Sequence, residues 1–200
     1  MMMSMASSRI TVRHRSAAAS IRRKQPGAVL LDLTSRGPAP WVKFSPFYPH
    51  GDIPVPGSPD RKAASVEGLW QALKVFERAD VDERKLDITN MKSLKRTTGK
   101  LGRVLGHREG LHGARLLGYI EARRELYLPA YRLVLTRDLG AELAELRRLA
   151  DSEAGVVLLD FETNTDVDDP ARPLSHAGLV MHWLQDTWPA ISRAAETSAS

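Results

Sequence analysis

Hydrophobic residues occur along this chain in short runs separated by polar turns. Residues 28–34, which follow Gly27, and residues 155–161, which begin with Gly155, are two aliphatic runs, and each predicts a buried strand. Trp41–Phe44 is expected to form a third short strand. No apolar run approaches the ~20 residues that a membrane span requires, so we expect no membrane partner.

A helical period is clearest after Ser65, a residue type that commonly caps helix N-termini. Over residues 66–78 the apolar positions recur at intervals of four and three, as in Leu69, Leu73 and Phe76, which predicts a helix with one buried face. Further helices are expected over residues 17–24, 87–98, 114–124, 130–135, 139–150 and 174–186.

Residues 45–64 contain five prolines and two glycines, a density that excludes a helix and a central strand. We therefore expect a loop of about twenty residues, which is long for a compact domain and typical of a functional segment. Because helices outnumber strands without regular alternation, the predicted fold class is α+β, with several helices packed around a small sheet. We expect one domain over residues 9–187, a disordered tail over 1–8 and a C-terminal tail over 188–200.

The composition narrows the kinds of site that are possible. Hydrophobic residues make up 42% of the chain and charged residues 26%, as in proteins with a sizeable core. There is no cysteine, which excludes disulfides, thiolate metal ligands and a cysteine nucleophile. The six histidines form no known ligand pair, and we expect neither a metal nor a cofactor.

The net charge of +5 is concentrated at the N-terminus. Residues 1–26 hold six basic and no acidic residues, so the rest of the chain carries a net charge of −1. Three interpretations of this segment are open. It is a short tail followed by a folded part of the domain, an organelle transit peptide, whose composition it shares, or a polybasic arm that binds nucleic acid. We favour ordinary structure and a cytoplasmic location.

The helix predicted after Ser65 carries the first candidate site. Glu67, Gln71 and Lys74 are spaced so that a carboxylate, an amide and a cation share one side of the helix, an arrangement that suits a polar ligand. The preceding loop supplies aromatic rings that can stack on a base. The alternative is that Glu67 only complements the helix dipole and that Lys74 is solvated.

Two charged segments provide further candidates. Residues 92–108 hold six basic residues that can clamp phosphates or a nucleic-acid backbone, and the alternative is a solvated face. Residues 160–169 form an acidic segment after the second predicted strand, a common position for catalytic or binding side chains. Solvated loop acids are the alternative there.

Two motifs of this chain resemble those of the NADAR superfamily of YbiA-like N-glycosidases. The first is FSPFYP at residues 44–49. The second is SVEGLWQALK at residues 65–74, which is similar to the family's S-x-E-x-x-Y/W-Q-A-x-K. The later elements follow in the family's order, so the resemblance covers residues 41–186.

The resemblance implies a small α+β domain that hydrolyses an N-glycosidic bond without a metal. The substrates it implies are ribosylated pyrimidine intermediates of riboflavin synthesis and ADP-ribose attached to guanine. The C-terminal half departs from the family, because residues 160–164 stand in place of its Trp-Gly motif and residues 174–179 in place of G-x-N-x-L-G. A non-catalytic binding module for a nucleotide, ADP-ribose or nucleic acid is therefore the alternative function.

We therefore expect a hydrolase that acts on a small phosphorylated, nucleotide-like ligand or an ADP-ribosylated base, with nucleic acid as a less favoured partner. Glu67 is the expected catalytic carboxylate, with Asp160 or Asp168 as its rival, and it would activate water or stabilise an oxocarbenium-like sugar. Lys74 is the expected donor to the leaving base. The expected substrate-binding residues are Phe47, Tyr48 and Trp70 for the base, Lys95, Arg96, Arg103 and Arg108 for the phosphate, and also Ser45, Gln71, Asn164 and His176.

Overall fold

The computed structural model describes residues 9–152 and 155–190, and the chain packs as two compact units. Of the described residues, unit 1 comprises residues 9–45, 139–152, 155–166 and 171–189. Unit 2 comprises residues 46–138, 167–170 and 190. The fold class is α+β, as predicted.

Unit 1 is built on a three-stranded parallel sheet in the order β1-β8-β2. Its strands are β1 (Ile10–His14), β2 (Val29–Asp32) and β8 (Val156–Asp160), and β8 is buried along its whole length. The central strand of a parallel sheet is covered on both faces, which explains its continuous apolar run. Helix α1 (Ala18–Lys24) connects β1 to β2.

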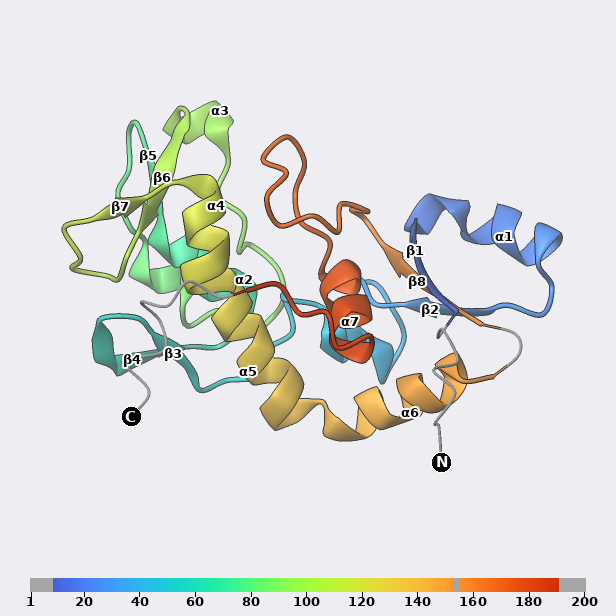
Figure 1. Ribbon diagram of the computed structural model, residues 1–200. Helices are drawn as coiled ribbons and strands as arrows, with labels where there is room; N and C mark the ends of the chain where they lie inside the picture. Colours follow the sequence, from blue (N-terminus) through green and yellow to red (C-terminus); the bar gives the residue numbers. More distant parts are fainter. Residues whose placement is uncertain (1–8, 153–154, 191–200) are drawn as a thin grey trace. The chain divides into compact units, whose positions relative to one another are not determined.

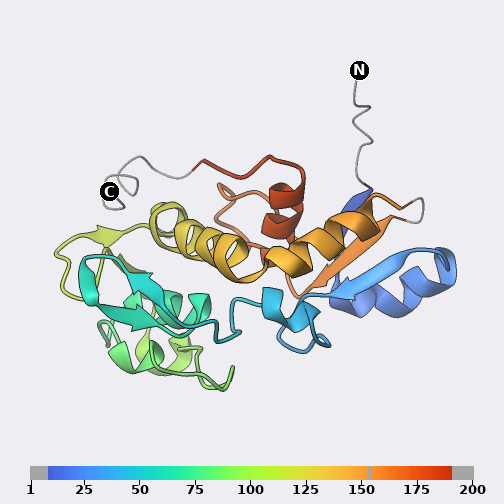
Figure 2. The same cartoon turned by 90° about the horizontal axis from the view of Figure 1, so that it is seen from below.

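Three helices surround this sheet. Helices α1 and α6 (Gly140–Ala150) lie on opposite sides of it (Figures 1 and 2). Helix α7 (His176–Leu184) packs against β1 and β8. Ser175 caps its N-terminus, because its Oγ accepts a hydrogen bond from the N–H of Gly178 at 3.0 Å. This cap places the start of α7 beside the carboxyl end of β8, where two of the predicted site residues lie.

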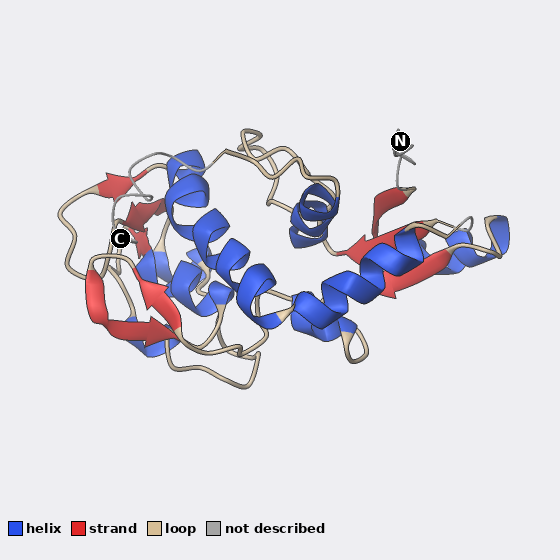
Figure 3. Cartoon of the chain, turned by 60° about the horizontal axis from the view of Figure 1, so that its bottom comes forward, coloured by secondary structure: helices blue, strands red, loops and turns tan. Residues whose placement is uncertain are grey.

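Unit 2 contains two small antiparallel sheets around helix α2 (Val66–Leu73). Strands β3 (Ile53–Val55) and β4 (Ser58–Ala63) form a hairpin. Strands β5 (Lys74–Phe76), β6 (Val104–Arg108) and β7 (Leu116–Leu117) form the second sheet, and α3 (Thr98–Leu101) precedes β6. Helix α4 (Tyr119–Ala122), a π-helical segment (Arg123–Tyr127) and α5 (Leu128–Asp138) form one continuous helical rod (Figure 3).

Several predicted elements are confirmed. The aliphatic runs at 28–34 and 155–161 are β2 and β8, and the helices expected at 17–24, 139–150 and 174–186 are α1, α6 and α7. Part of the basic N-terminal segment forms β1 and α1, which is ordinary structure. The predicted tail over 1–8, and residues 191–200 of the other tail, lie outside the described residues. None of the described helices is long and apolar enough to span a bilayer.

The helix predicted over 87–98 is wrong. These residues form turns, with only the last residue in helix α3, and Met91 and Ser93 have positive φ values of 58°, which a helix cannot contain. The side chain of Asn90 accepts a hydrogen bond from the N–H of Lys92, so it stabilises a local turn that competes with a helix. Of the apolar residues after Leu86, only Leu94 anchors this loop in the core.

The structureless loop predicted over 45–64 and the strand at Trp41–Phe44 are also wrong. The former contains the β3–β4 hairpin, and the latter is a 3₁₀-helix. Pro54 is tolerated because a two-stranded hairpin has only edge strands, where a missing N–H breaks no central ladder. Ile53 and Val55 alternate with it and are buried. Gly57 turns the hairpin with φ of 64°.

The ends of two predicted helices differ from the structure. The helix expected over 66–78 ends at Leu73, because residues 74–76 pair with β6 as strand β5. Residues 114–124 include the short strand β7 before the helical rod begins. Strands β1 and β6 are not predicted by the hydrophobic pattern, because both are short and mixed with basic residues.

Candidate functional site

Helix α2 of unit 2 carries most of the candidate site. Ser65 caps it, because its Oγ accepts a hydrogen bond from the N–H of Gly68 at 3.0 Å. The N–H of Glu67 donates to the carbonyl of Pro46 at 2.8 Å, which ties the FSPFYP loop to the first turn. Every residue of the helix except Trp70 is buried. The polar side chains of this helix therefore lie inside the protein.

Glu67 and Gln71 form a buried hydrogen-bonded pair one turn apart. Gln71 Nε2 donates to Glu67 Oε1 at 2.8 Å, and Gln71 Oε1 accepts the backbone N–H of Arg96 at 3.0 Å. Because an amide has one donor end and one acceptor end, these partners fix its orientation. Glu67 is only 8% exposed. Gln71 thus holds the carboxylate of Glu67 in a defined position.

Lys74 follows the end of α2 as the first residue of β5. Among the described residues its ammonium forms no hydrogen bond and no ion pair, and its Nζ lies 5.8 Å from the ring centroid of Trp70. Burial lowers the pKa of Lys74; the charge of Glu67 opposes this change, and the charges of Arg96 and Lys95 add to it. Such an ammonium releases its proton at a lower pH than an ordinary lysine.

The ring of Trp70 belongs to an aromatic cluster beside these charged groups. Its centroid lies 3.8 Å from that of His107, 6.1 Å from Tyr119 and 5.7 Å from Tyr127. The guanidinium of Arg123 lies 4.2 Å from the Tyr119 ring centroid and is held by two backbone carbonyl groups. Tyr119 is 39% exposed, so the cluster reaches the surface, where a planar ligand can stack.

His107 belongs to the basic segment at residues 92–108, but the sequence does not predict it as a site residue. It pairs with Lys74 in the register of β5 and β6, it is 1% exposed, and neither ring nitrogen has a hydrogen-bond partner among the described residues. Burial, and then the charge of Lys74, lowers the pKa of His107 to about 3, so the imidazole is neutral at physiological pH. Buried polar atoms are rarely left unpaired, and exceptions often mark a functional position.

The four basic residues predicted to hold a phosphate have different surroundings. Arg96 donates to three backbone carbonyl groups and is therefore a structural clamp. Arg103 and Arg108 form surface ion pairs with acidic residues of the same unit. Lys95 forms no hydrogen bond and no ion pair with a described residue, and its Nζ lies 5.7 Å from the ring centroid of Phe47. Lys95 is thus the member of this set whose ammonium has no acidic partner.

The aromatic residues of the FSPFYP loop are only partly brought to the site. Phe47 lies under Lys95, but the ring contact of Tyr48 among the described residues is with His50, at 4.8 Å between centroids. The aromatic wall beside Trp70 is formed instead by tyrosines of the helical rod. Ser45 is buried at the end of the first segment of unit 1, and its predicted role stays a prediction.

Asp160 and His176 form a buried pair in unit 1. Asp160 Oδ2 accepts hydrogen bonds from Ser175 Oγ at 2.7 Å and Ala177 N at 3.2 Å, and it lies 3.0 Å from His176 Nδ1. Burial raises the pKa of Asp160, but the charge of His176 and these hydrogen bonds outweigh it and bring the pKa to about 2. Burial lowers the pKa of His176, but Asp160 and a hydrogen bond to the carbonyl of Leu33 outweigh it and raise the pKa.

The remaining predicted residues of the acidic segment have structural partners. Asn164 Oδ1 accepts the N–H of Asp166 at 2.9 Å, and its Nδ2 donates to the carbonyl of Arg172 at 3.2 Å, so it organises the loop. Asp168 belongs to unit 2, where both carboxylate oxygens lie 2.7 Å from Arg124 Nη2. Both expected rivals of Glu67 therefore have a cationic partner of their own.

Comparison with known families identifies one match. Residues 13–180 match DUF6939, a family of unknown function. No curated protein and no solved structure matches the chain. The matched segment includes the Glu67–Lys74 cluster and the Asp160–His176 pair, so both belong to the part of the chain that the family describes.

Proposed function

We propose that this chain, which belongs to the family of unknown function DUF6939, is a hydrolase that cleaves the N-glycosidic bond of a nucleotide-like substrate. One observation carries the proposal: in unit 2 the charge of the buried Glu67 carboxylate acts on the Lys74 ammonium, which forms no ion pair with a described residue and lies beside the ring of Trp70. The resemblance to the NADAR superfamily supports it, because these residues, with Gln71, are those of the shared motif.

Hydrolysis of an N-glycosidic bond breaks the bond between the anomeric carbon and the base nitrogen. Water supplies a hydroxyl group to the sugar and a proton to the base. Positive charge develops on the sugar in the transition state, so a fixed carboxylate beside it lowers the barrier. Glu67 takes this role and accepts the proton of the attacking water, while Gln71 holds it in place.

The leaving base needs a proton, and Lys74 is placed to donate it. An ordinary lysine holds its proton too tightly to be an efficient acid near neutral pH, and the lowered pKa of Lys74 reduces this mismatch. Because its ammonium forms no ion pair within the part of the chain that the structure describes, the proton is available to a ligand. Trp70 and Tyr119 would stack on the base, and Lys95 would contact a phosphate.

We expect the rate to fall as the pH rises through the lowered pKa of Lys74, because the donor must be protonated. Lys74→Arg keeps the charge but titrates at much higher pH. The alkaline limb of the profile, where the rate falls, should therefore move to higher pH, and the maximal rate should fall by about 10²-fold or more. The measurement is kcat/KM for base release as a function of pH. Lys95→Arg is the control and should leave the limb in place; an unshifted limb in Lys74→Arg would exclude Lys74 as the donor.

The function itself is tested by incubating the full chain with ribosylaminouracil phosphate and with DNA that carries ADP-ribosylated guanine. We expect release of the free base from one of them. Binding of ADP-ribose without release of a base from either would favour the binding module. Affinity for DNA that falls steeply with salt and is insensitive to Trp70→Ala would indicate backbone binding through the basic segments.

A further inference from the structure

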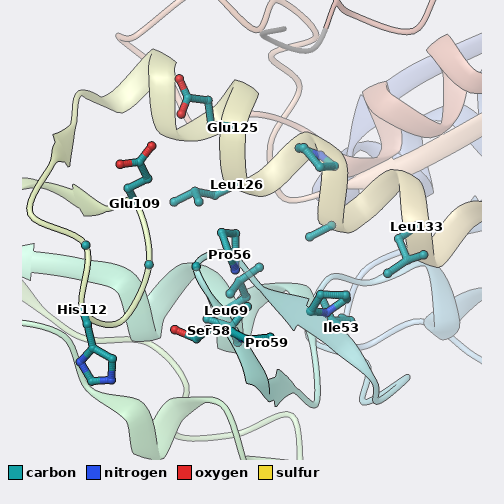
Figure 4. A pocket seen from close by; sticks show the side chains of 17 residues that line it. Ile53, Pro56, Ser58, Pro59, Leu69, Glu109, His112, Glu125, Leu126 and Leu133 are labelled. Atoms are coloured by element: carbon teal, nitrogen blue, oxygen red, sulfur yellow. The ribbon is translucent and has the colours of Figure 1, made fainter. Parts of the chain in front are cut away.

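Unit 2 contains a cavity of about 930 Å³ whose lining residues lie outside the candidate site (Figure 4). This volume is in the range of small-molecule sites. Leu69 of α2 lines the cavity, whereas the adjacent Trp70 belongs to the aromatic cluster described above. Leu69 and Trp70, which are adjacent in α2, thus belong to two different regions of unit 2.

Most of the cavity wall is apolar. The β3–β4 hairpin contributes Ile53, Val55 and three prolines, and the helical rod contributes Leu126 and Leu133. Figure 4 shows the side chains of the hairpin and of the rod facing each other across the cavity. An apolar body is therefore favoured as its occupant, because burial of such a body in this space removes apolar surface from water.

Two carboxylates at one side of the cavity are incompletely neutralised. Glu109 Oε1 and Glu125 Oε1 each lie 3.0 Å from the guanidinium of Arg115, which also pairs with Glu121. Three carboxylates thus share one cation, and Glu109 and Glu125 each retain an oxygen with no hydrogen-bond partner among the described residues. The Glu125 side chain is 12% exposed, so this charge is largely desolvated.

A buried hydroxyl provides an independent observation. Ser58 is 8% exposed and lines the cavity, and its Oγ has no hydrogen-bond partner among the described residues. Figure 4 shows this oxygen turned toward the side where the loop with Glu109 and His112 closes the cavity. A buried hydroxyl is rarely left without a partner in a folded protein, and a donor on a ligand would satisfy it.

We propose that this cavity binds a small organic cation, an amine carried on an apolar or aromatic body. The body would fill the space between the hairpin and the helical rod. The ammonium would donate hydrogen bonds to the carboxylate oxygens of Glu125 and Glu109 that lack a partner among the described residues, and an N–H group on the body, such as that of an indole, would donate to Ser58 Oγ, which Figure 4 shows apart from the two carboxylates. An anion of the same shape would face two carboxylates and is excluded. This proposal does not depend on N-glycosidase activity.

Tryptamine and indole-3-propionate test the proposal, because they share the ring and differ in the charge of the side chain. We expect calorimetric titration of the full chain to show binding of tryptamine and none of indole-3-propionate. Glu125→Gln should weaken tryptamine binding at least tenfold, and Ser58→Ala should weaken it several-fold. Glu121→Gln is the matched control, because Glu121 also pairs with Arg115 but does not line the cavity, and it should leave the affinity unchanged.

Thermal unfolding of each variant would show that the fold is retained before its affinity is interpreted. Equal binding of the amine and the acid would overturn the proposal, as would absence of tryptamine binding to the wild-type chain. Equal affinities of Glu125→Gln and Glu121→Gln for tryptamine would also overturn the proposal. Any change would then follow from the loss of a carboxylate that pairs with Arg115, whether or not it lines the cavity.

Discussion

Glu67→Gln is expected to lower kcat/KM for release of the base by about 10²–10⁴-fold, the usual contribution of a positioned acid–base group. The amide keeps the volume of the carboxylate, and its oxygen can still accept the hydrogen bond of Gln71. The negative charge beside the developing positive sugar is lost, and so is the acceptor for the proton of the attacking water. Initial rates of base release from the active substrate give the comparison.

Glu77→Gln is the matched control for this variant. Glu77 is a surface carboxylate of the same unit that pairs with Arg103, and its removal should leave kcat/KM unchanged. A surface pair of this kind contributes little to stability, so the control should also fold normally. Equal rates for Glu67→Gln and the wild-type chain would remove Glu67 from the mechanism.

Asp160→Asn is expected to destabilise unit 1 by about 3–5 kcal/mol, the usual cost of leaving one partner of a buried ion pair uncompensated. His176 would lose the carboxylate that keeps its buried ring protonated, so the ion pair is lost, and the hydrogen bonds that Ser175 and Ala177 donate would weaken. Hydrogen exchange of the β8 amides measures the effect locally, which matters because two compact units need not unfold in a single transition. Asp151→Asn, an exposed change in the same unit, should have almost no effect.

The same pair predicts how the stability of unit 1 depends on pH. The pKa of His176 is raised on folding, so its contribution is complete below the unfolded value of 6.5 and is lost as the pH rises through the folded pKa. The pKa of Asp160 is lowered from 3.8 to about 2, so its contribution is present above 3.8 and is lost as the pH falls toward 2.

In Asp160→Asn the loss of stability at alkaline pH should disappear, because a buried imidazole without a carboxylate partner is neutral between pH 5 and 9. Hydrogen exchange of β8 in wild type and variant between pH 5 and 9, corrected for the intrinsic exchange rate, provides the profile. An alkaline loss of the same size in both proteins would show that another group controls the stability of unit 1.

The sequence predicts the buried strands of unit 1 and the helices beside them, because continuous aliphatic runs and capped helical periods are local signals. It does not predict the β3–β4 hairpin, since a proline is compatible with a strand only when no further strand pairs beside it. The helix predicted over residues 66–78 also extends beyond the end of α2 at Leu73. Phe76 continues the helical period, but residues 74–76 pair instead with β6, over residues 104–107.

The candidate site is predictable where it depends on spacing within one helix. Glu67 and Gln71 are one turn apart and are predicted to share one side of the helix, and Gln71 donates a hydrogen bond to Glu67. Lys74, predicted on the same side, lies instead at the start of β5. His107 could not be identified in this way, because it meets Lys74 only through the antiparallel pairing of β5 with β6. Tyr48 and Arg96 have chemically suitable side chains, but tertiary contacts direct them to His50 and to backbone carbonyl groups.

The central claim is that the Glu67–Lys74 site hydrolyses an N-glycosidic bond, and the most direct measurement is product analysis in water enriched with ¹⁸O. The wild-type chain should release the free base and place one ¹⁸O atom on the anomeric carbon of the sugar, and the Glu67→Gln/Lys74→Met double variant should bind the substrate and leave it intact. Recovery of the intact substrate from the wild-type chain, after binding has been shown by calorimetry, would contradict the claim.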